Sequence, residues 1–528
     1  MPLRLDRRHL LTALGSSFAS AMGTEGLAKA SSPESAVTLG PPQPFSFDGL
    51  KRHAAHLARR PYSTALPEDE KTLEAIDYDA FVQANYRPDR TLWANTPGAQ
   101  PVRLFPLGRS FPQSVAIHVL EDGQAKEVIY SLDLFDMPAG HPLRRLRGGG
   151  FSGFRLMSRG GESDWLAFLG ASYFRASDPF DQYGASARGL AINSGGPAPE
   201  EFPRFSAFWL EQDGPHPAGG GGLRVYALLE GPSVVGAYRM DCRREPSGAV
   251  QDIEATLYFR APVESLGLAP LTSMFWYGEN TRKVPADWRP QIHDSDGLAI
   301  WTGAGERLWR PLDNPSRVLT NAYADALPHG YGLIQRNRAF NSYMDDGLFY
   351  EKRPSVWVEV LDSAPASAWT QGAVRLVQLP TAGETDDNIV AFWRPGATID
   401  AGASLAVRYR LNWTTDAPAP AGSGRIVSTR LGPGGRPGFP SVAGAVKFVI
   451  DVEGADLQAL TRSSGVEAAV TASAGAVSDI LAYPVVGTTR WRIMFDVAGI
   501  PAEGASLRAY LHRQDQVLSE TWVFEAFP

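Results

Sequence analysis

The sequence has a single cysteine, and beyond its N-terminus it has no long apolar run. The one cysteine, Cys242, excludes an intramolecular disulfide, so the fold must be stable without one. Cys242 lies in MDCRRE, where no neighbour resembles the base that would activate a thiol, and we expect it buried or half-buried in a strand. Because no later segment approaches about 18 uninterrupted apolar residues, we expect no membrane insertion.

The sequence also lacks the charge pattern and the motifs of several function classes. Its formal net charge is −7 and no basic cluster is interleaved with aromatic residues, so we expect no nucleic-acid partner. It contains neither GxSxG nor HExxH, and its nine histidines are scattered. His53 and His56 stand three residues apart with no third ligand nearby. We therefore expect no metal and no cofactor.

Glycine, proline and aromatic residues are abundant instead. The chain holds 53 Gly and 41 Pro together with 13 Trp, 17 Tyr and 25 Phe, a mixture typical of many short strands joined by turns. Its 528 residues suggest two or three domains. Strand-like alternation without a strand–helix rhythm predicts an all-β fold, with a large antiparallel β-sandwich over 44–396. Within it, 115–120 and 128–135 flank EDGQ and predict a hairpin.

The C-terminal part predicts a second, smaller domain. Pro395 and Gly396 mark the boundary, and 397–403 is the expected linker. Apolar and polar residues then alternate at 405–413, 490–497 and 506–513, separated by turn-rich stretches. This pattern favours an immunoglobulin-like β-sandwich over 404–528 that lacks the usual disulfide. The Gly/Pro-rich stretch 417–444 looks unsuited to a core, and a loop of that length is either disordered or functional.

The N-terminus predicts export from the cytoplasm. Arg7 and Arg8 precede a short, weakly apolar run, and Ala28-Lys29-Ala30 offers the small residues that a signal peptidase reads. We interpret 1–30 as a twin-arginine (Tat-type) signal peptide that leads to the periplasm. Polar, Pro-rich residues 31–43 should form a flexible lead-in, and the apolar spacing over 47–57 predicts a surface helix.

The stretch QIHDSDGLAIWTG, residues 291–303, places Asp294 and Asp296 two positions apart. On a strand both carboxylates would project from one face and repel each other, whereas a turn would fan them apart. A solvated turn is the simplest interpretation. An EF-hand loop is excluded, because no further ligands follow and no Glu stands at the last ligand position.

Several blocks of the sequence together resemble a known family, the osmoregulated periplasmic glucan biosynthesis proteins G and D. These blocks are YFRASDPFDQYGASARGLAINS (173–194), EEFPRF (200–205), SMFWYGEN (273–280), HDSDGLAIWTG (293–303), WRPLDNP (309–315) and GETDDNIVAFW (383–393). The resemblance covers nearly the whole mature chain and implies the same two-sandwich fold. The twin arginines favour a D-like member, since the D-type proteins are the ones exported by Tat.

The resemblance implies a function in making or maturing periplasmic β-1,2-glucan. Members look like inverting glycoside hydrolases or related transglycosylases that use two aspartates. By resemblance Asp387 is the general acid, and the general base lies in HDSDG, where we favour Asp294 over Asp296. An inverting enzyme needs its two carboxyl groups roughly 6.5–9.5 Å apart, with a water between them. Apolar residues 389–393 suit the protonated acid, and His293 and Ser295 suit the ionised base.

The same motifs suggest residues that contact β-1,2-glucan. They are Tyr173, Arg175, Tyr183, Arg188, Trp276, Tyr277, His293, Trp301, Trp309 and Arg310. Such residues in a β-sandwich are more often structural than functional, and only the motif context selects them. We interpret Asp345, Asp346 and Glu351 as loop charges or, at most, distal sugar contacts.

A second hypothesis assigns no catalysis to the protein. In it the chain is a glucan-binding scaffold that holds the polymer for a membrane-bound glucan synthase, and the C-terminal domain docks a partner. A homodimer is the expected assembly, by analogy with D-like proteins. An Asp387→Asn variant that loses turnover but still binds glucan would separate the enzyme from the scaffold.

Overall fold

The structure is a computed structural model. It describes residues 37–64, 67, 69–158, 160–216, 220–281, 287–361, 368–436, 438 and 444–528. The predicted signal peptide 1–30 and the first half of the lead-in lie outside these residues. The remainder of the lead-in joins a sheet, because Gln43 and Pro44 pair with Ala125 and Gln124.

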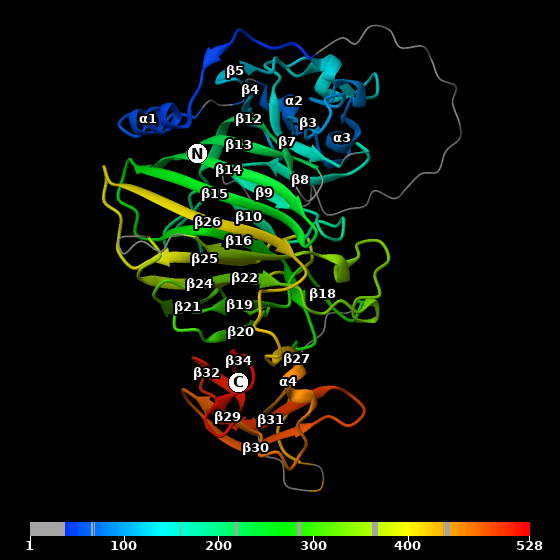
Figure 1. Ribbon diagram of the computed structural model, residues 1–528, viewed down its shortest axis with the longest axis vertical. Helices are drawn as coiled ribbons and strands as arrows, with labels where there is room; N and C mark the ends of the chain where they lie inside the picture. Colours follow the sequence, from blue (N-terminus) through cyan, green and yellow to red (C-terminus); the bar gives the residue numbers. More distant parts are fainter. Residues whose placement is uncertain are drawn as a thin grey trace, which may run out of the picture.

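Two large sheets form the body of the molecule (Figure 1). In the described part of the chain the larger has sixteen strands. Their spatial order is β1 (Gln43–Pro44), β5 (Gln124–Glu127), β4 (Ala116–Glu121), β12 (Arg204–His216), β13 (Gly220–Glu230), β14 (Val234–Glu245), β15 (Gly248–Phe259), β26 (Ser404–Thr414), β23 (Ser355–Val360), β22 (Gly330–Ile334), β19 (Gly297–Trp301), β20 (Arg307–Pro311), β34 (Thr521–Ala526), β32 (Ala505–Arg513) and β29 (Glu467–Ala472), with β33 (Gln516–Val517) beside β32.

The second sheet has ten strands among the described residues and faces the first. Its order is β21 (Leu319–Asp325), β24 (Gly372–Gln378), β25 (Ile389–Pro395), β16 (Leu266–Ser273), β10 (Ser186–Arg188), β9 (Tyr173–Ala176), β8 (Asp164–Leu169), β7 (Phe151–Met157) and β3 (Val102–Pro106), with β11 (Ala191–Ile192) beside β16. Nearly all pairs in both sheets are antiparallel; β4 and β12 are parallel, as are β20 and β34. This architecture confirms the predicted all-β sandwich.

Smaller elements complete the fold. Two short pairs are β17 (Phe275–Tyr277) with β18 (Ile292–His293) and β2 (Asn85–Tyr86) with β6 (Phe135–Asp136). The helices are α1 (Phe47–Leu57), α2 (Glu70–Glu74), α3 (Tyr78–Gln83), α4 (Ala455–Gln458) and the 3₁₀ turns η3 (Pro88–Arg90), η4 (Leu132–Leu134), η5 (Pro142–Arg145), η6 (Phe340–Ser342) and η7 (Tyr350–Lys352). None of the helices in the described residues has the length and apolar character needed to cross a membrane.

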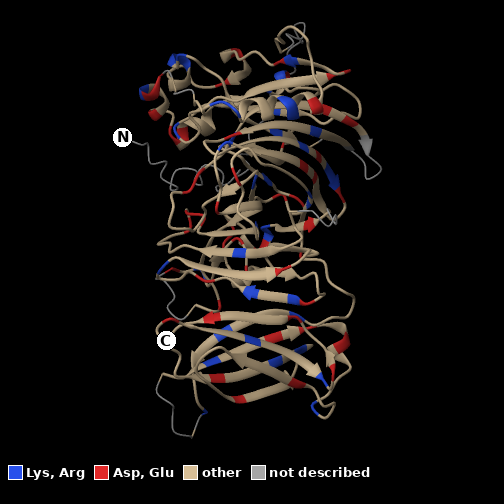
Figure 2. Ribbon diagram, turned by 90° about the vertical axis from the view of Figure 1, so that its left-hand side faces the viewer, with Lys and Arg blue, Asp and Glu red and all other residues tan. Residues whose placement is uncertain are grey.

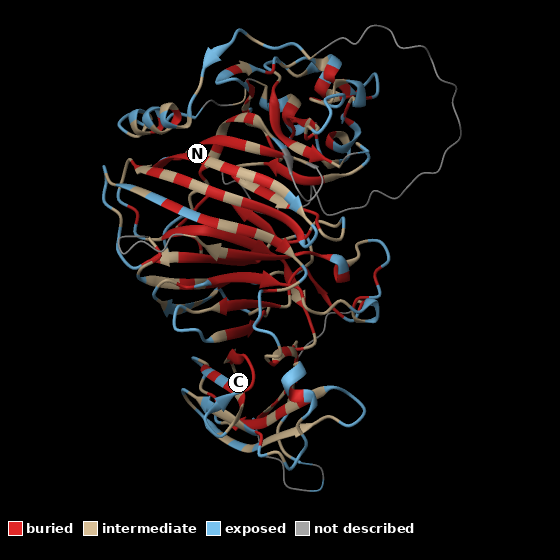
Figure 3. Cartoon of the chain, in the orientation of Figure 1, coloured by how far each residue is buried: buried red, intermediate tan, exposed pale blue. Residues whose placement is uncertain are grey.

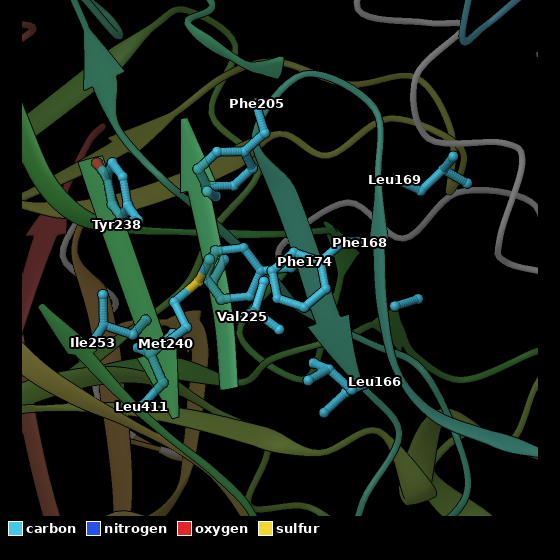
Figure 4. Close-up of a cluster of buried hydrophobic side chains, with 14 of the residues drawn as sticks. Leu166, Phe168, Leu169, Phe174, Phe205, Val225, Tyr238, Met240, Ile253 and Leu411 are labelled. Atoms are coloured by element: carbon cyan, nitrogen blue, oxygen red, sulfur yellow. The ribbon is translucent and has the colours of Figure 1, made fainter. Parts of the chain in front are cut away.

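The main core lies between the two large sheets. Over 238–243 of β14 and 251–259 of β15, buried and partly buried side chains alternate, as the striped strands of Figure 3 show. Phe168 and Phe174 of the second sheet meet Met240 and Val225 of the first in this layer (Figure 4). Each large apolar side chain buried there stabilises the fold by roughly 1.5–3 kcal/mol. Cys242, also on β14, is buried as predicted.

The C-terminal unit is a smaller sandwich that shares a sheet with the body. One of its sheets contains β27 (Arg425–Pro433), β28 (Val446–Glu453), β31 (Arg490–Ala498) and β30 (Ala476–Pro484). The other, β34–β32–β29, continues the sixteen-stranded sheet past β20. Phe448, Phe495 and Trp522 pack between them, and both basic and acidic residues lie along the strands of this unit (Figure 2).

Three local predictions differ from the structure. Strand β26 was assigned to the C-terminal domain, but it pairs with β15 and β23, so residues 404–414 belong to the large sheet. The stretch 417–444 contains strand β27, with Ile426 fully buried, although residues 437 and 439–443 lie outside the described part. The predicted hairpin forms with β5 at 124–127 as its second strand, and 128–135 mostly continues as an irregular connection. Helix α1 matches its prediction.

Candidate active site

The structure brings Asp294 and Asp387 together through one shared segment, residues 273–275. The Asp294 amide donates to the Met274 carbonyl at 2.9 Å, and the hydroxyls of Ser273 and Ser295 are 2.8 Å apart. On the other side, the Asn388 side chain accepts from the Phe275 amide at 2.8 Å and donates to the Phe275 carbonyl at 2.9 Å. The residues that flank both aspartates are thus fastened to neighbouring positions of the same strand end.

Asp387 is partly buried, and Asp294 is the more buried of the two aspartates. Asp387 directly precedes β25, whose first residues Ile389 and Val390 are buried in the sheet. Burial and the nearby charge of Asp294 together raise the pKa of Asp387 to about 7, against the opposing effect of Arg175. A carboxyl group with this pKa holds its proton near neutral pH, as a general acid must.

Asp294 is buried beside two cations. Burial raises its pKa, whereas Arg353 and Arg175 lower it. The Arg353 Nε lies 3.5 Å from Asp294 Oδ1, which is an ion pair too long for a hydrogen bond. Neither of these two atoms has a hydrogen-bond partner among the described residues. Buried unsatisfied polar atoms are costly, so two that face each other mark a place where a ligand or water completes the bonding.

Arg175 contributes a further open donor set. It lies on β9, and its guanidinium stacks over the Tyr183 ring at 4.9 Å from the ring centre. The Tyr183 hydroxyl is fixed by Asp164 at 2.6 Å. Burial lowers the pKa of Arg175, and the charges of Asp387 and Asp294 counteract this. Its Nε and Nη2 are buried without a hydrogen-bond partner in the described part of the chain, so they are available to a ligand.

A network of ion pairs around Arg289 and Glu384 lies next to the loop that carries Asp387. Arg289 donates to Glu384 at 2.8 Å and to Asp345 at 3.0 Å, and it also binds Asp287. The Tyr350 hydroxyl donates to Glu384 at 2.6 Å. Glu384 lies three residues before Asp387, so these bonds hold the loop that carries the predicted acid.

Sequence analysis missed most of this network. Arg353 and Tyr350 stand in YEKRP (350–354), and Glu384 stands in GETDDN, so charged residues next to a selected motif were the only available signal. Asp345 is not a solvated loop charge, because it is buried and binds Arg289 and the amides of Gly347 and Leu348. Glu351 is buried as well, whereas Asp346 is exposed as expected.

Asp296 points to a different part of the molecule. Its Oδ2 accepts the backbone amides of Arg336 and Asn337 at 2.5 and 2.7 Å. Its other oxygen lies 3.6 Å from the His293 ring, whose pKa is lowered by burial. This carboxylate borders a pocket between the body and the C-terminal unit, which is lined by Phe275, Gly278, Glu279, Asn280, Gln291, His293, Asp296, Trp309, Pro311, Arg336, Val427, Ser428 and Thr429.

Four predicted sugar contacts are engaged elsewhere. Tyr277 is buried and donates to the Arg289 carbonyl at 2.8 Å. Trp301 ends β19, roughly 13 Å along the strand from Gly297, and packs against the C-terminal core. Trp309 lies in that same core, and the buried Arg310 stacks over Phe524. The structure does not bring the last three to the Asp294–Asp387 pair.

The remaining predicted contacts lie nearer or support the site. Arg188 on β10 is 2 % exposed, binds Glu200 at 3.0 Å and lowers the pKa of Asp387. Tyr173 packs against Arg188, with 5.3 Å from guanidinium to ring centre. Trp276 packs edge-on against Tyr277, and His293 is held between Gln335 and Gln291. In the described residues no three His, Cys, Asp or Glu side chains gather as a metal site would require.

Comparison with known proteins identifies close relatives along the whole chain. The family model described as "Periplasmic glucan biosynthesis protein, MdoG" matches residues 45–526. "Glucans biosynthesis protein D 1" of Ralstonia nicotianae is 45 % identical over 548 residues, covering 99 % of each chain. "Glucans biosynthesis protein D 2" of the same organism is 42 % identical over 538 residues, covering 99 % of this chain and 98 % of its own. "Glucans biosynthesis protein D" of Stenotrophomonas maltophilia is 43 % identical over 501 residues, covering 93 % of this chain and 91 % of its own.

Proposed function

Because this chain belongs to the family of periplasmic glucan biosynthesis proteins, we propose that it is a β-1,2-glucan-processing enzyme with two catalytic aspartates. It cleaves the glucan chain with inversion, and the glycosyl acceptor is water or a sugar hydroxyl. The names of the relatives support the role in glucan biosynthesis. The β-1,2 linkage and the chemistry come from the family resemblance of the HDSDG and GETDDN motifs.

In this mechanism Asp387 is the general acid. It protonates the leaving oxygen of the glycosidic bond, which requires a carboxyl that keeps its proton at the pH of the reaction. A pKa of about 7 fits that requirement. After the bond breaks, Asp387 carries the negative charge, and Arg175 and Arg188 stabilise it electrostatically.

Asp294 is the general base. It takes a proton from the attacking nucleophile, so it must be ionised while Asp387 is protonated. Arg353 and Arg175 both favour the ionised form of Asp294. The pair therefore works with one shared proton, and Arg353, which faces Asp294 at 3.5 Å, favours the negative charge on Asp294.

One observation carries the proposal: a buried and a partly buried carboxyl group, both with raised pKa values, lie near arginines whose buried nitrogens lack a hydrogen-bond partner in the described part of the chain. Structural ion pairs normally satisfy each other, as Arg336 and Glu520 do at 2.8 Å. Strongly perturbed carboxyl groups beside open donors are typical of catalytic sites. A scaffold that only binds sugar hydroxyls has no need of a carboxyl group with a pKa near 7.

The test uses the purified mature protein and linear β-1,2-glucan, with products followed by chromatography and by NMR of the anomeric protons. New α-anomeric oligosaccharides are the expected result for inverting hydrolysis. Products without a new reducing end would assign the transglycosylase. Glucan binding without any product would refute the enzyme and favour the scaffold that serves a membrane-bound synthase.

We also propose that residues 1–30 direct export through the Tat pathway to the periplasm. The twin arginines Arg7 and Arg8 support this, and the absence of disulfides suits a protein that folds before export. Replacement of both by Lys should leave the precursor in the cytoplasm, as followed by fractionation. Export of the variant at the normal rate would contradict the Tat assignment.

Association with a membrane-bound glucan synthase and formation of a homodimer stay predictions. The mass of the purified protein in solution, measured by light scattering, tests the homodimer. Cross-linking in cells that contain the synthase tests the association with it.

A further inference from the structure

The segment 335–354 connects the ends of two neighbouring strands, β22 and β23, and passes through the candidate active site. It carries Arg353, which faces Asp294, and Tyr350, which holds Glu384. Its backbone is largely irregular, with only the short turns η6 and η7. A segment of this kind keeps its position through specific bonds rather than through a strand ladder.

The segment is fixed at its start by Asp296. One oxygen of this carboxylate accepts the amides of Arg336 and Asn337. Asp296 is thus bonded to the backbone that leads to Arg353, while its neighbour Asp294 faces Arg353 itself. The two aspartates of the HDSDG turn therefore contact the two ends of one segment.

The side chain of Arg336 continues this anchor into the C-terminal unit. Its guanidinium stacks over Trp309, 3.7 Å from the ring centre. It donates to both oxygens of Glu520 at 2.8 and 2.9 Å and to the Ile426 carbonyl at 2.7 Å. A two-pronged arginine–carboxylate contact of this kind fixes direction as well as distance.

Glu520 belongs to the C-terminal unit and is buried there, with 2 % exposure. It directly precedes β34, the strand that joins the unit to β20 of the body (Figure 1). It also accepts the Ile426 amide at 3.0 Å and binds Arg307 at 3.1 Å. A buried carboxylate is costly unless its oxygens are hydrogen-bonded, and the partners of Glu520 come from both units.

Arg338 connects the start of the segment to the residues next to the candidate active site. Its Nη1 donates to the carbonyls of Glu351 and Arg353 at 2.9 and 3.0 Å. Its Nη2 donates to the Thr415 carbonyl at 2.8 Å, just beyond β26. The chain of contacts therefore runs from Glu520 through Arg336 and the segment to Arg353 and Asp294.

From these contacts we propose that Glu520 is a positioning residue, through which the C-terminal unit holds segment 335–354 in place for catalysis. The C-terminal unit then completes the active site instead of serving only as a docking module. The effect on turnover rests on the proposed function of the site. The effect on the segment itself does not, and the experiment reads the two separately.

The experiment compares full-length wild type with Glu520→Gln in two measurements. Hydrogen–deuterium exchange should become faster in peptides covering 335–354, while peptides from the strands of the main core stay protected. For turnover of β-1,2-glucan, kcat should fall by about 3- to 30-fold and KM should change little, because the sugar contacts on β9 and β10 are untouched.

The matched control is Arg508→Gln. Arg508 binds Glu306 at 2.6 Å and also joins the two units, but this pair is exposed and makes no contact with segment 335–354 among the described bonds. Its exchange pattern and kcat should equal those of the wild type. If Glu520→Gln folds poorly, Arg336→Lys keeps the charge, loses the two-pronged contact and should give the same local exchange and kcat effect.

The proposal is overturned if the segment exchanges in Glu520→Gln as it does in Arg508→Gln, or if exchange rises equally throughout the molecule. It is also overturned if exchange rises locally while kcat of an active enzyme is unchanged. If the wild type shows no turnover, the proposed function fails, and the exchange measurement alone still decides whether Glu520 holds the segment.

Discussion

Asp294 and Asp296 stand two residues apart in one turn, yet their surroundings are opposite. Asp296 has one oxygen fully occupied by two backbone amides. Asp294 has an oxygen that faces Arg353 at 3.5 Å without a hydrogen bond. The turn fans the two carboxylates apart, as one alternative from the sequence predicted, but the simplest interpretation, a solvated turn, was wrong because Asp294 and Ser295 are buried. This difference supports the proposal that Asp296 holds the backbone and Asp294 acts on a ligand.

The same contrast separates the two sides of the site. Between the large sheets, Asp387, Asp294 and Arg175 perturb one another's pKa values and leave donors open. At the junction with the C-terminal unit, Arg336 and Glu520 satisfy each other. Open, perturbed groups indicate chemistry, whereas closed networks indicate positioning.

The largest effect is expected for Asp387→Asn. An amide cannot donate the required proton, so turnover of β-1,2-glucan should fall by about 10³-fold while glucan binding persists. Turnover is measured by reducing ends and binding by calorimetry. The neighbouring Asp386→Asn is the control and should keep most of the activity. Equal losses of turnover in Asp387→Asn and Asp386→Asn would show that the substitutions disturb the loop and that Asp387 is not the general acid.

Removal of the cation beside Asp294 should have the next largest effect. Arg353 lowers the pKa of Asp294, so in Arg353→Gln this pKa rises and the base is ionised only at higher pH. We expect kcat/KM to fall by about 10- to 100-fold, with the acidic limb of the pH profile moved upward. Arg353→Lys keeps a charge and should shift the limb less. If the acidic limb of the pH profile does not move in Arg353→Gln, Arg353 does not control the pKa of the base.

A smaller effect is expected on the basic limb. Asp387 must be protonated, and its pKa is about 7, so activity of the wild type should decline above this pH. Arg175 lowers the pKa of Asp387, and Arg175→Gln should therefore extend the active range to higher pH, even though the rate falls. A limb that moves to lower pH would contradict the assigned acid.

The smallest effect is expected for Trp301→Phe. The sequence motif selected Trp301 as a sugar contact, but the structure places it at the far end of β19 against the C-terminal core. The KM for glucan should change by less than about twofold. A large rise in KM would show that Trp301 does contact the glucan. The glucan would then have to extend over the junction between the body and the C-terminal unit.

The sequence was a good guide to the fold because strand alternation is local. Strands β4, β31 and β32 lie where the apolar period of two predicted them. The boundary at 404 was wrong for a non-local reason: β26 alternates like a sandwich strand, and only its partners β15 and β23 decide which sandwich it joins. Strand β27 shows the same limit, because its pairing with β28 and the burial of Ile426 are non-local and cannot be read from its Gly/Pro-rich sequence.

The site was predictable only in part. The resemblance selected Asp387 and the HDSDG turn, and the fold brings both to residues 273–275. The cations that tune them could not be ranked from sequence. Arg175 and Arg310 look alike in their motifs, yet one faces the aspartates and the other stacks on Phe524. The face of the sheet that an arginine occupies depends on strand pairing between segments far apart in the sequence. Composition and motif spacing carry no information about that pairing.

The most direct test of this account is a side-by-side measurement of kcat and glucan affinity in Asp294→Asn and Asp296→Asn. We predict that Asp294→Asn loses at least about 10²-fold in kcat with affinity retained, because the base is gone. Asp296→Asn keeps an oxygen that accepts the Arg336 and Asn337 amides, and it should lose about tenfold or less. A reversal, with Asp296→Asn inactive and Asp294→Asn nearly normal, would contradict the assignment of the open carboxylate to chemistry and the bonded one to support.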